Sequence, residues 1–127
     1  MAPIDHSESR KKDLTREIVD NENRLNTLHG LIARLDSEEA EADKELHRSI
    51  KNVSKIYDAW RGPEAKRYVD QTINEYENTL KTLHRDAGRI REDMREEASD
   101  LKRKQEYLHE DLDRMEREDD IQDGETD

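Results

Sequence analysis

The sequence has little of what a disulfide-linked or sheet-based fold needs. Its 127 residues include no Cys and no Phe, with only four Gly and two Pro. The lack of Cys excludes disulfides and thiolate metal sites within the chain. Few turn residues and no β-branched runs argue against strands, whereas 45% charged residues with abundant Leu and Ala are typical of long helices. Composition therefore predicts an all-α protein, with a disordered chain as the alternative. The spacing of the apolar residues distinguishes the two.

Long apolar runs are also missing. No stretch approaches the roughly 18 apolar residues of a membrane span, and no apolar segment near Met1 has the form of a signal peptide. The formal net charge of −11, from 34 acidic and 23 basic residues, opposes binding to nucleic-acid phosphates and anionic lipids. We expect no membrane span, no nucleic-acid partner and no Sec-type export.

Residue patterns of catalytic, metal and cofactor sites are absent as well. The five His are dispersed, and none belongs to a His-Glu-x-x-His motif or another i, i+4 ligand pair. There is no Gly-rich phosphate loop, no Gly-x-Ser-x-Gly motif and no Cys nucleophile. The many carboxylates need burial or a pocket to act as catalytic acids or bases. We expect no enzymatic activity, no catalytic residues, no cofactor and no metal.

What the sequence does contain is a sustained heptad pattern. Steps of four and three residues from Leu14 reach Trp60, and eleven of these fourteen positions are apolar, where about four are expected by chance. The same stepping from Val69 to Met94 meets only apolar residues. The apolar residues at these heptad positions form a stripe along each helix, which we call the seam. We predict that the seam binds a partner through Leu25, Leu28, Ile32, Leu35, Leu46, Val53, Ile56, Val69, Ile73, Tyr76, Leu80, Leu83, Ile90 and Met94.

A turn separates the two seams at Trp60-Arg61-Gly62-Pro63-Glu64. Gly62 suits the left-handed conformation that ends a helix, and Pro63 suits the first position of the next one. We expect helix one at about 10–60, the turn at 61–63 and helix two at about 64–117, paired as an antiparallel hairpin. Residues 1–9 and the acidic residues 118–127 lack the pattern and are predicted to be flexible tails.

A two-helix hairpin buries little surface against the entropy of ordering about 100 residues, so it requires a partner. Further apolar side chains beside the seam would complete a four-helix bundle with that partner, and they are Leu31, Ile50, Tyr57, Tyr68 and Leu112. Asn21 and Glu39 are polar at seam positions, which costs stability and helps to select one partner over others. The pattern favours a dedicated heteromeric partner and leaves a homodimer open.

The chain's single Trp is followed two residues later by Gly, in the central turn of a charged helical hairpin. This arrangement resembles the WXG superfamily of small type VII secretion proteins. The stretch from Trp60 to Tyr68, with the long charged helix after it, looks most like the helical accessory proteins of LXG toxins. The resemblance covers residues 10–115, but only Trp60 and Gly62 are sharp matches, and the high charge departs from the minimal, Ala-rich members. The alternative is a core Trp beside an ordinary helix stop.

The export signal of that superfamily is a Tyr followed four residues later by an acidic residue, near the end of the second helix. Tyr107 and Asp111 match it. With four Tyr and 34 acidic residues, about one such pair is expected by chance. The match is therefore informative only because the pair lies near the end of the second predicted helix. The i, i+4 spacing places both side chains on one helical face, where a receptor could contact them together.

The resemblance implies a non-enzymatic, chaperone-like secretion partner. Such a protein binds helices of a co-exported LXG-type toxin or of a sibling WXG-like protein, and it docks on the type VII export machinery. It would be cytoplasmic before export and then secreted without a cleaved signal peptide. Two alternatives stay open: a homodimeric WXG-type secreted protein, and an intracellular coiled-coil adaptor unrelated to secretion.

Overall fold

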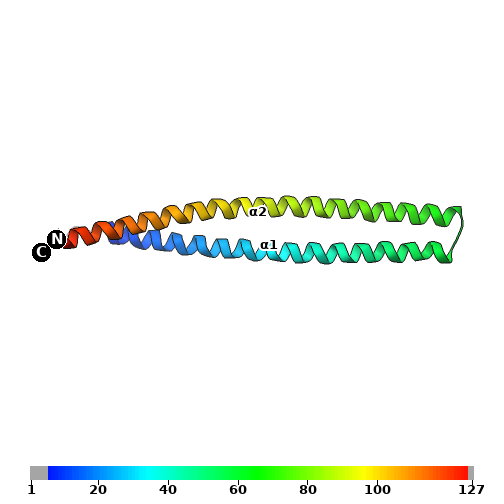
Figure 1. Cartoon of the computed structure of the whole chain (residues 1–127), viewed down its shortest axis with the longest axis horizontal. Coiled ribbons are helices and arrows are strands. Elements are labelled where there is room, and N and C mark those ends of the chain that lie inside the picture. The colour runs from blue at the N-terminus through cyan, green and yellow to red at the C-terminus, as the bar shows by residue number, and fades with distance from the viewer. Residues whose placement is uncertain (1–5, 126–127) are drawn as a thin grey trace. The chain divides into compact units, whose positions relative to one another are not determined.

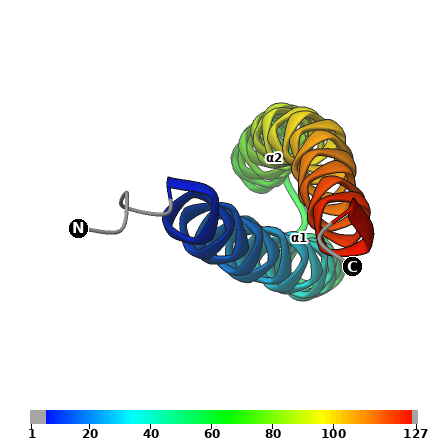
Figure 2. The same ribbon diagram turned by 90° about the vertical axis from the view of Figure 1, so that its left-hand side faces the viewer.

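A computed structural model describes residues 6–125 of the chain. This part consists of two helices, α1 at His6–Ala59 and α2 at Pro63–Glu125 (Figure 1). The ribbon of the described residues contains no strand, and both helices are unbroken in the end-on view of Figure 2. Because α1 and α2 pack against each other, the all-α helical hairpin predicted from the heptad pattern is confirmed.

The turn comprises Trp60, Arg61 and Gly62, one residue earlier than expected. The carbonyl of Ile56 accepts a hydrogen bond from the Trp60 amide at 2.7 Å, which closes the last turn of α1. Gly62 has a φ of 153°, a conformation that a residue with a Cβ adopts only under strain. Pro63 then begins α2, where its missing N–H costs no helical hydrogen bond. The Gly-Pro pair therefore fixes where one helix stops and the next begins.

Both helices extend further toward the chain ends than predicted. α1 begins at His6 and α2 continues to Glu125, so residues 6–9 and 118–125 are helical. Asp119 accounts for part of this extension, because its carboxylate pairs with Lys11 and accepts a hydrogen bond from Ser7 Oγ at 3.5 Å. The other predicted tail residues, 1–5 and 126–127, lie outside the described part of the chain.

The chain divides into two compact units, each containing a part of both helices. The terminal unit comprises the described residues of Met1–Gly30 and Arg95–Asp127, and the turn unit comprises Leu31–Met94. The core cluster of the terminal unit consists of Leu14, Ile18 and Leu108, with Leu112 and Met115 packed against it. We call the buried and half-buried residues along the side of a helix that faces the other helix its inner residues. In this unit those of α2 include Ala98, Leu101, Gln105, Leu108, Leu112 and Met115. Their steps of three and four residues are the heptad spacing that the sequence predicts.

In the turn unit, the inner residues of α2 follow an eleven-residue spacing instead. They recur in sets eleven residues apart, namely Ala65, Tyr76 and Ala87 in one set and Val69, Leu80 and Arg91 in another. At the end of this unit the heptad position Ile90 is 51% exposed, whereas the neighbouring Arg91 side chain is only 19% exposed. Eleven residues complete three helical turns at about 3.67 residues per turn, so the inner side keeps its direction only with this longer period.

Candidate functional site

The residues predicted for the partner-binding seam lie mostly inside the hairpin. Leu28, Val53, Val69 and Leu80 are buried; Leu25, Ile32, Leu35, Leu46, Ile73, Tyr76, Leu83 and Met94 are half-buried; Ile56 and Ile90 are exposed. The first two groups stabilise the hairpin itself, and their contact with a partner stays a prediction. Sequence reasoning missed the inner residues Ala65, Ala98 and Arg91, because small or charged side chains do not stand out in a search for large apolar ones.

An ionic network links α1 and α2 in the turn unit. Arg91 Nε lies 2.7 Å from Asp36 Oδ1, and Arg91 Nη2 lies 2.5 Å from Glu39 Oε1. His84 Nδ1 lies 3.1 Å from Glu39 Oε2, and His84 Nε2 lies 2.7 Å from Asp43 Oδ1. The network explains why Glu39 is polar at a seam position, since two basic side chains of α2 bind its carboxylate. The sequence indicated Glu39 but gave no reason to pair it with His84 or Arg91.

His84 makes this network sensitive to protons. Both ring nitrogens face carboxylate oxygens, so only the doubly protonated ring donates to both. The hydrogen bond to Glu39, and then that to Asp43, raises the pKa of His84 above 6.5. The same bond, followed by the one from Arg91, holds the pKa of Glu39 below 4.5. His47 Nδ1 lies 3.3 Å from the other oxygen of Asp43, which places a second imidazole at the edge of the network.

The terminal unit holds two inward-facing amide side chains, the buried Asn21 and the half-buried Gln105. Asn21 is 7% exposed, and Gln105 donates a hydrogen bond from Nε2 to the Ile18 carbonyl at 3.0 Å. Asn21 Nδ2 and Gln105 Oε1 are buried and have no hydrogen-bond partner among the described residues. A buried polar group without a partner costs about 1–3 kcal/mol. This polar layer, which the sequence predicts at Asn21, therefore reduces the stability of the unit.

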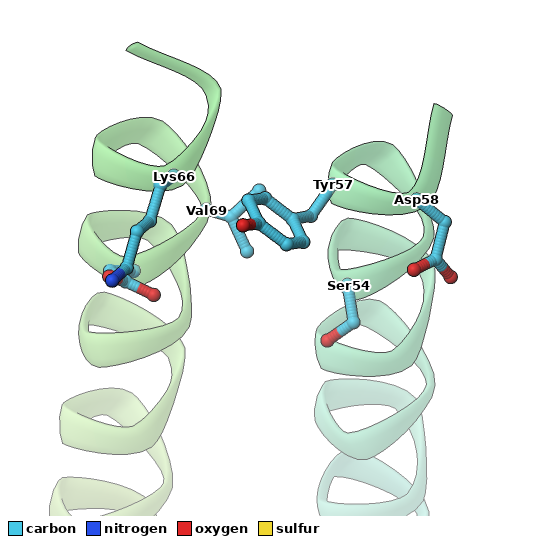
Figure 3. A pocket seen from close by; sticks show the side chains of 6 residues that line it. Ser54, Tyr57, Asp58, Lys66 and Val69 are labelled. Carbon is cyan, nitrogen blue, oxygen red and sulfur yellow. The ribbon is translucent and has the colours of Figure 1, made fainter. Parts of the chain in front are cut away.

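Large apolar side chains are exposed on one side of the turn unit. Leu31, Tyr68 and Ile90 are 42%, 51% and 51% exposed, and each directly precedes an inner residue of its helix. In an antiparallel helix pair, the positions that precede the inner residues on both helices flank the same side of the interface. Ile56, 37% exposed, precedes Tyr57, whose ring points toward α2 (Figure 3). We call Leu31, Ile56, Tyr68 and Ile90 the apolar face.

The Trp-x-Gly motif lies in the turn, where Trp60 is 52% exposed. This exposure does not fit the alternative in which Trp60 is an ordinary core residue. A hollow of about 520 Å³ lies beside it, lined by Trp60, Gly62, Pro63, Glu64, Ala65 and Arg67. A second hollow of about 380 Å³ is lined by Ser54, Tyr57, Asp58, Lys66, Val69 and Asp70 (Figure 3). The turn therefore presents concave surface beside an exposed aromatic ring.

Tyr107 and Asp111, the predicted export signal, lie on α2 in the terminal unit. Tyr107 is 68% exposed, and the Asp111 side chain is 40% exposed while its Oδ1 accepts a hydrogen bond from Arg114 Nη2 at 3.0 Å. The continuous helix places the two residues on one face, where both are accessible. Their role in export stays a prediction.

No group of three or more His, Asp or Glu side chains in the described residues is placed to hold a metal ion. Over the same part of the chain, neither helix has an apolar stretch long enough to cross a membrane. Comparisons with protein-family models, curated proteins and solved structures found no match to this chain. The function therefore has to be argued from the exposed surfaces.

Proposed function

We propose that this protein is a non-enzymatic partner protein of type VII secretion, which binds helices of a co-exported protein. Its partner in this proposal is the helical N-terminal region of an LXG-type toxin or a sibling WXG-like protein. The observation that carries the proposal is the apolar face, where four large side chains are exposed on one side of a two-helix pair. The exposed Trp60 beside Gly62 supports the link to secretion, through the resemblance to the WXG superfamily.

The small core supports the need for a partner. Among the described residues, Leu28 is the one large side chain with a relative exposure below 2%, although the two helices span 54 and 63 residues. Fully burying an exposed Leu, Ile or Tyr on a partner contributes about 1.5–3 kcal/mol per side chain, which offsets part of the entropy of ordering the hairpin. A second pair of helices would supply this burial.

A partner helix on the apolar face would contact α1 and α2 together. The Arg91 contact with Asp36 sets the register of the two helices. This register brings Ile90 of α2 within about two helical turns of Leu31 on α1. An amphipathic helix with apolar residues at i, i+3 and i+4 can cover side chains with that separation. Binding then needs no chemistry beyond burial, and this agrees with the proposal of a non-enzymatic role.

The first test is co-purification from native cells, with identification by mass of every protein that accompanies the chain. The double variant Leu31→Glu and Ile90→Glu should lose at least about 90% of the accompanying helical protein, because each substitution places a charge in an apolar contact. The matched control is Ala40→Glu with Asn74→Glu, which adds two charges at exposed positions outside the apolar face. Equal recovery from both variants would sink the proposed binding surface.

The second test separates binding from export. Replacing Trp60 by Ala should reduce the amount of this protein in the medium while the partner still co-purifies from the cells, because Trp60 lies in the turn and outside the apolar face. A secretion assay and a co-purification on the same strain give both quantities. Equal loss of export and of partner binding would contradict a separate role of the turn in export.

The same purification distinguishes the two alternatives. Recovery of the chain with a larger protein at equal stoichiometry supports the heteromeric partner. Recovery as a homodimer in the medium supports the homodimeric secreted protein. A homodimer confined to the cytosol, with no export defect on replacing Trp60, supports the coiled-coil adaptor.

A further inference from the structure

The charge of the chain is unevenly distributed, and the hairpin tip has a net positive charge although the chain as a whole is acidic. We define the tip as residues 44–70, on both sides of the turn. It contains seven Lys or Arg and four Asp or Glu, whereas the rest of the chain contains 16 basic and 30 acidic residues. Charges separated by more than about 8 Å are largely screened at physiological ionic strength. A ligand at the tip therefore meets a locally positive surface on an acidic protein.

The cations of the tip are available for a ligand. Elsewhere in the described chain, most arginines pair with carboxylates, as Arg24 does with Glu97 at 2.9 Å. Within the described residues, no carboxylate lies within ion-pair distance of Arg61 or Arg67. Arg67 lines the hollow of about 520 Å³ beside Trp60. The hollow thus combines an indole ring with a guanidinium that has no ion pair, while Glu64 also lines the hollow.

The aromatic residues of the chain concentrate at the same place. Tyr57, Trp60 and Tyr68 are three of only five aromatic residues, and they are 40%, 52% and 51% exposed. Trp, Tyr and Arg are the side chains that most often dominate binding energy at protein interfaces. Their joint exposure on a chain that is otherwise poor in aromatic residues indicates an interaction surface.

We infer that the tip is a docking surface for an acidic segment of a partner protein, in which carboxylates bind Arg61 and Arg67 while an apolar side chain packs on Trp60. This surface goes beyond the proposed function, since helix binding on the apolar face does not use Trp60, Arg61 or Arg67, although Ile56 and Tyr68 of that face also lie within the tip. Charge complementarity selects the occupant. Arg binds carboxylates with two parallel hydrogen bonds, which favours Asp or Glu over uncharged side chains.

A nucleic acid fits the tip less well than an acidic protein segment. Duplex DNA carries about one charge per 1.7 Å of its axis and would extend well past the tip. Asp58, Glu64 and Asp70 also lie among the basic residues of the tip, and they would repel a continuous line of phosphates. An acidic segment needs only a few carboxylates, and these can align with the two arginines.

Trp60 provides the readout, because it is the chain's single Trp and lies inside the proposed site. The full chain is titrated with a synthetic helical peptide built from a Leu-Glu-Glu repeat. The control peptide has Gln in place of every Glu, and a poly-dT oligonucleotide serves as the phosphate probe. We expect a saturable change in Trp60 fluorescence with the Glu peptide, at least about tenfold weaker binding of the Gln peptide, and weakening of the Glu complex by added salt.

Two matched variants complete the experiment. The double variant Arg61→Glu with Arg67→Glu should weaken binding of the Glu peptide by at least about tenfold. The control variant Lys81→Glu with Arg89→Glu reverses as much charge on α2 outside the tip, and it should change this binding by less than about twofold. If the first variant no longer shows the circular dichroism spectrum of a helical protein, the neutral double variant Arg61→Gln with Arg67→Gln replaces it. Equal effects of the two charge-reversed variants, no saturable binding of the Glu peptide, or tighter binding of poly-dT would overturn the inference.

Discussion

The terminal unit and the turn unit contain parts of the same two helices, yet the inner residues of α2 follow a different spacing in each. In the terminal unit, Leu14, Ile18 and Leu108 form an apolar cluster with heptad spacing. In the turn unit, the spacing of α2 is eleven residues, and Arg91 occupies an inner position where it pairs with Asp36 and Glu39. Ion pairs also link the helices of the terminal unit, where Lys11 pairs with Asp119 and Arg24 with Glu97. The two units therefore differ in the spacing of α2 and in the Arg at an inner position, and not in whether ion pairs are present.

This difference determines which apolar side chains of α2 stay exposed. Because Arg91 takes the inner position, the neighbouring Ile90 stays exposed and becomes part of the apolar face. The terminal unit carries 11 basic and 20 acidic residues, whereas the turn unit carries 12 and 14. Like-charge repulsion acts more strongly on the terminal unit, so this unit depends more on its apolar cluster. The turn unit has nearly balanced charge and exposes large apolar side chains.

The largest expected effect concerns the cluster of the terminal unit. Leu108→Ala should lower the free energy of unfolding by about 2–4 kcal/mol, because it removes a buried side chain from the middle of the cluster. Chemical denaturation followed by circular dichroism measures the change. Tyr107→Ala is the control, since its side chain is 68% exposed and its loss should change stability by less than about 0.5 kcal/mol. Similar losses for the two variants would show that the cluster does not hold the unit together.

The buried amide layer of the same unit should respond in the opposite direction. Asn21→Leu should raise the free energy of unfolding by about 1 kcal/mol, because it replaces a buried donor without a partner by an apolar side chain. It should also weaken the selection of one helix pairing, which sedimentation would detect as additional oligomers. Asn23→Leu, at an exposed position, is the control. A decrease in stability for Asn21→Leu alone would mean that the amides are hydrogen-bonded in solution.

The turn unit should depend on pH through His84. The pKa of His84 is raised in the folded chain, so its contribution to stability is fully present below its unfolded pKa of 6.5 and is lost as the pH rises through the raised value. Glu39 and Asp43 on α1 face the ring, with Arg91 on α2 and His47 on α1 beside them. The melting temperature should therefore fall across this range in the wild type.

The variant His84→Gln isolates that effect. It cannot take up the proton, so its melting temperature should fall less over the same pH range, and the two curves should converge at high pH. Differential scanning calorimetry of both proteins gives the comparison. Parallel curves for the wild type and the variant would contradict a proton-dependent link at His84.

The smallest effect should come from Ile90. Replacing it by Ser should change stability by less than about 0.5 kcal/mol, because half of its side chain is already exposed. Ile73→Ala, at a half-buried position of the same helix, should cost about 1–2 kcal/mol. A cost for Ile90→Ser as large as that for Ile73→Ala would restore the heptad spacing and refute the eleven-residue spacing of the turn unit.

Much of the fold could be predicted from sequence, because a repeated apolar pattern and one Gly-Pro turn determine it. The seam from Leu14 to Val53 was readable from its spacing, and turn chemistry predicted the start of α2 to within one residue of Pro63. The change of the α2 spacing from seven to eleven residues could not be predicted from the sequence. Ile90 and Arg91 are adjacent, and a search for apolar residues selects Ile90. The start of α1 and the end of α2 were also predicted too short. The ion pair near these ends joins Lys11 and Asp119, which are 108 positions apart and polar, so the apolar pattern does not indicate it.

The candidate site was less predictable than the fold. Trp60 and Gly62 stand out by rarity, and Tyr107 with Asp111 by spacing, so the sequence alone indicated them. The sequence also indicated each residue of the apolar face, Ile56 and Ile90 within the seam and Leu31 and Tyr68 beside it. It did not show that these four share one side, because this depends on which residues turn inward in the folded pair. Nor does the sequence show that Arg61 and Arg67 are without acidic partners, since acidic residues occur close to both.

The most direct test of the central claim is chemical labelling of the apolar face in the native complex. The chain contains no Cys, so single variants Leu31→Cys, Ile90→Cys and Ala40→Cys each report one position by the rate of thiol alkylation. Rates are compared between the free chain and the complex purified from native cells. We predict that alkylation at positions 31 and 90 slows at least about tenfold in the complex while that at position 40 stays unchanged. Unchanged rates at all three positions would show that no partner covers the apolar face.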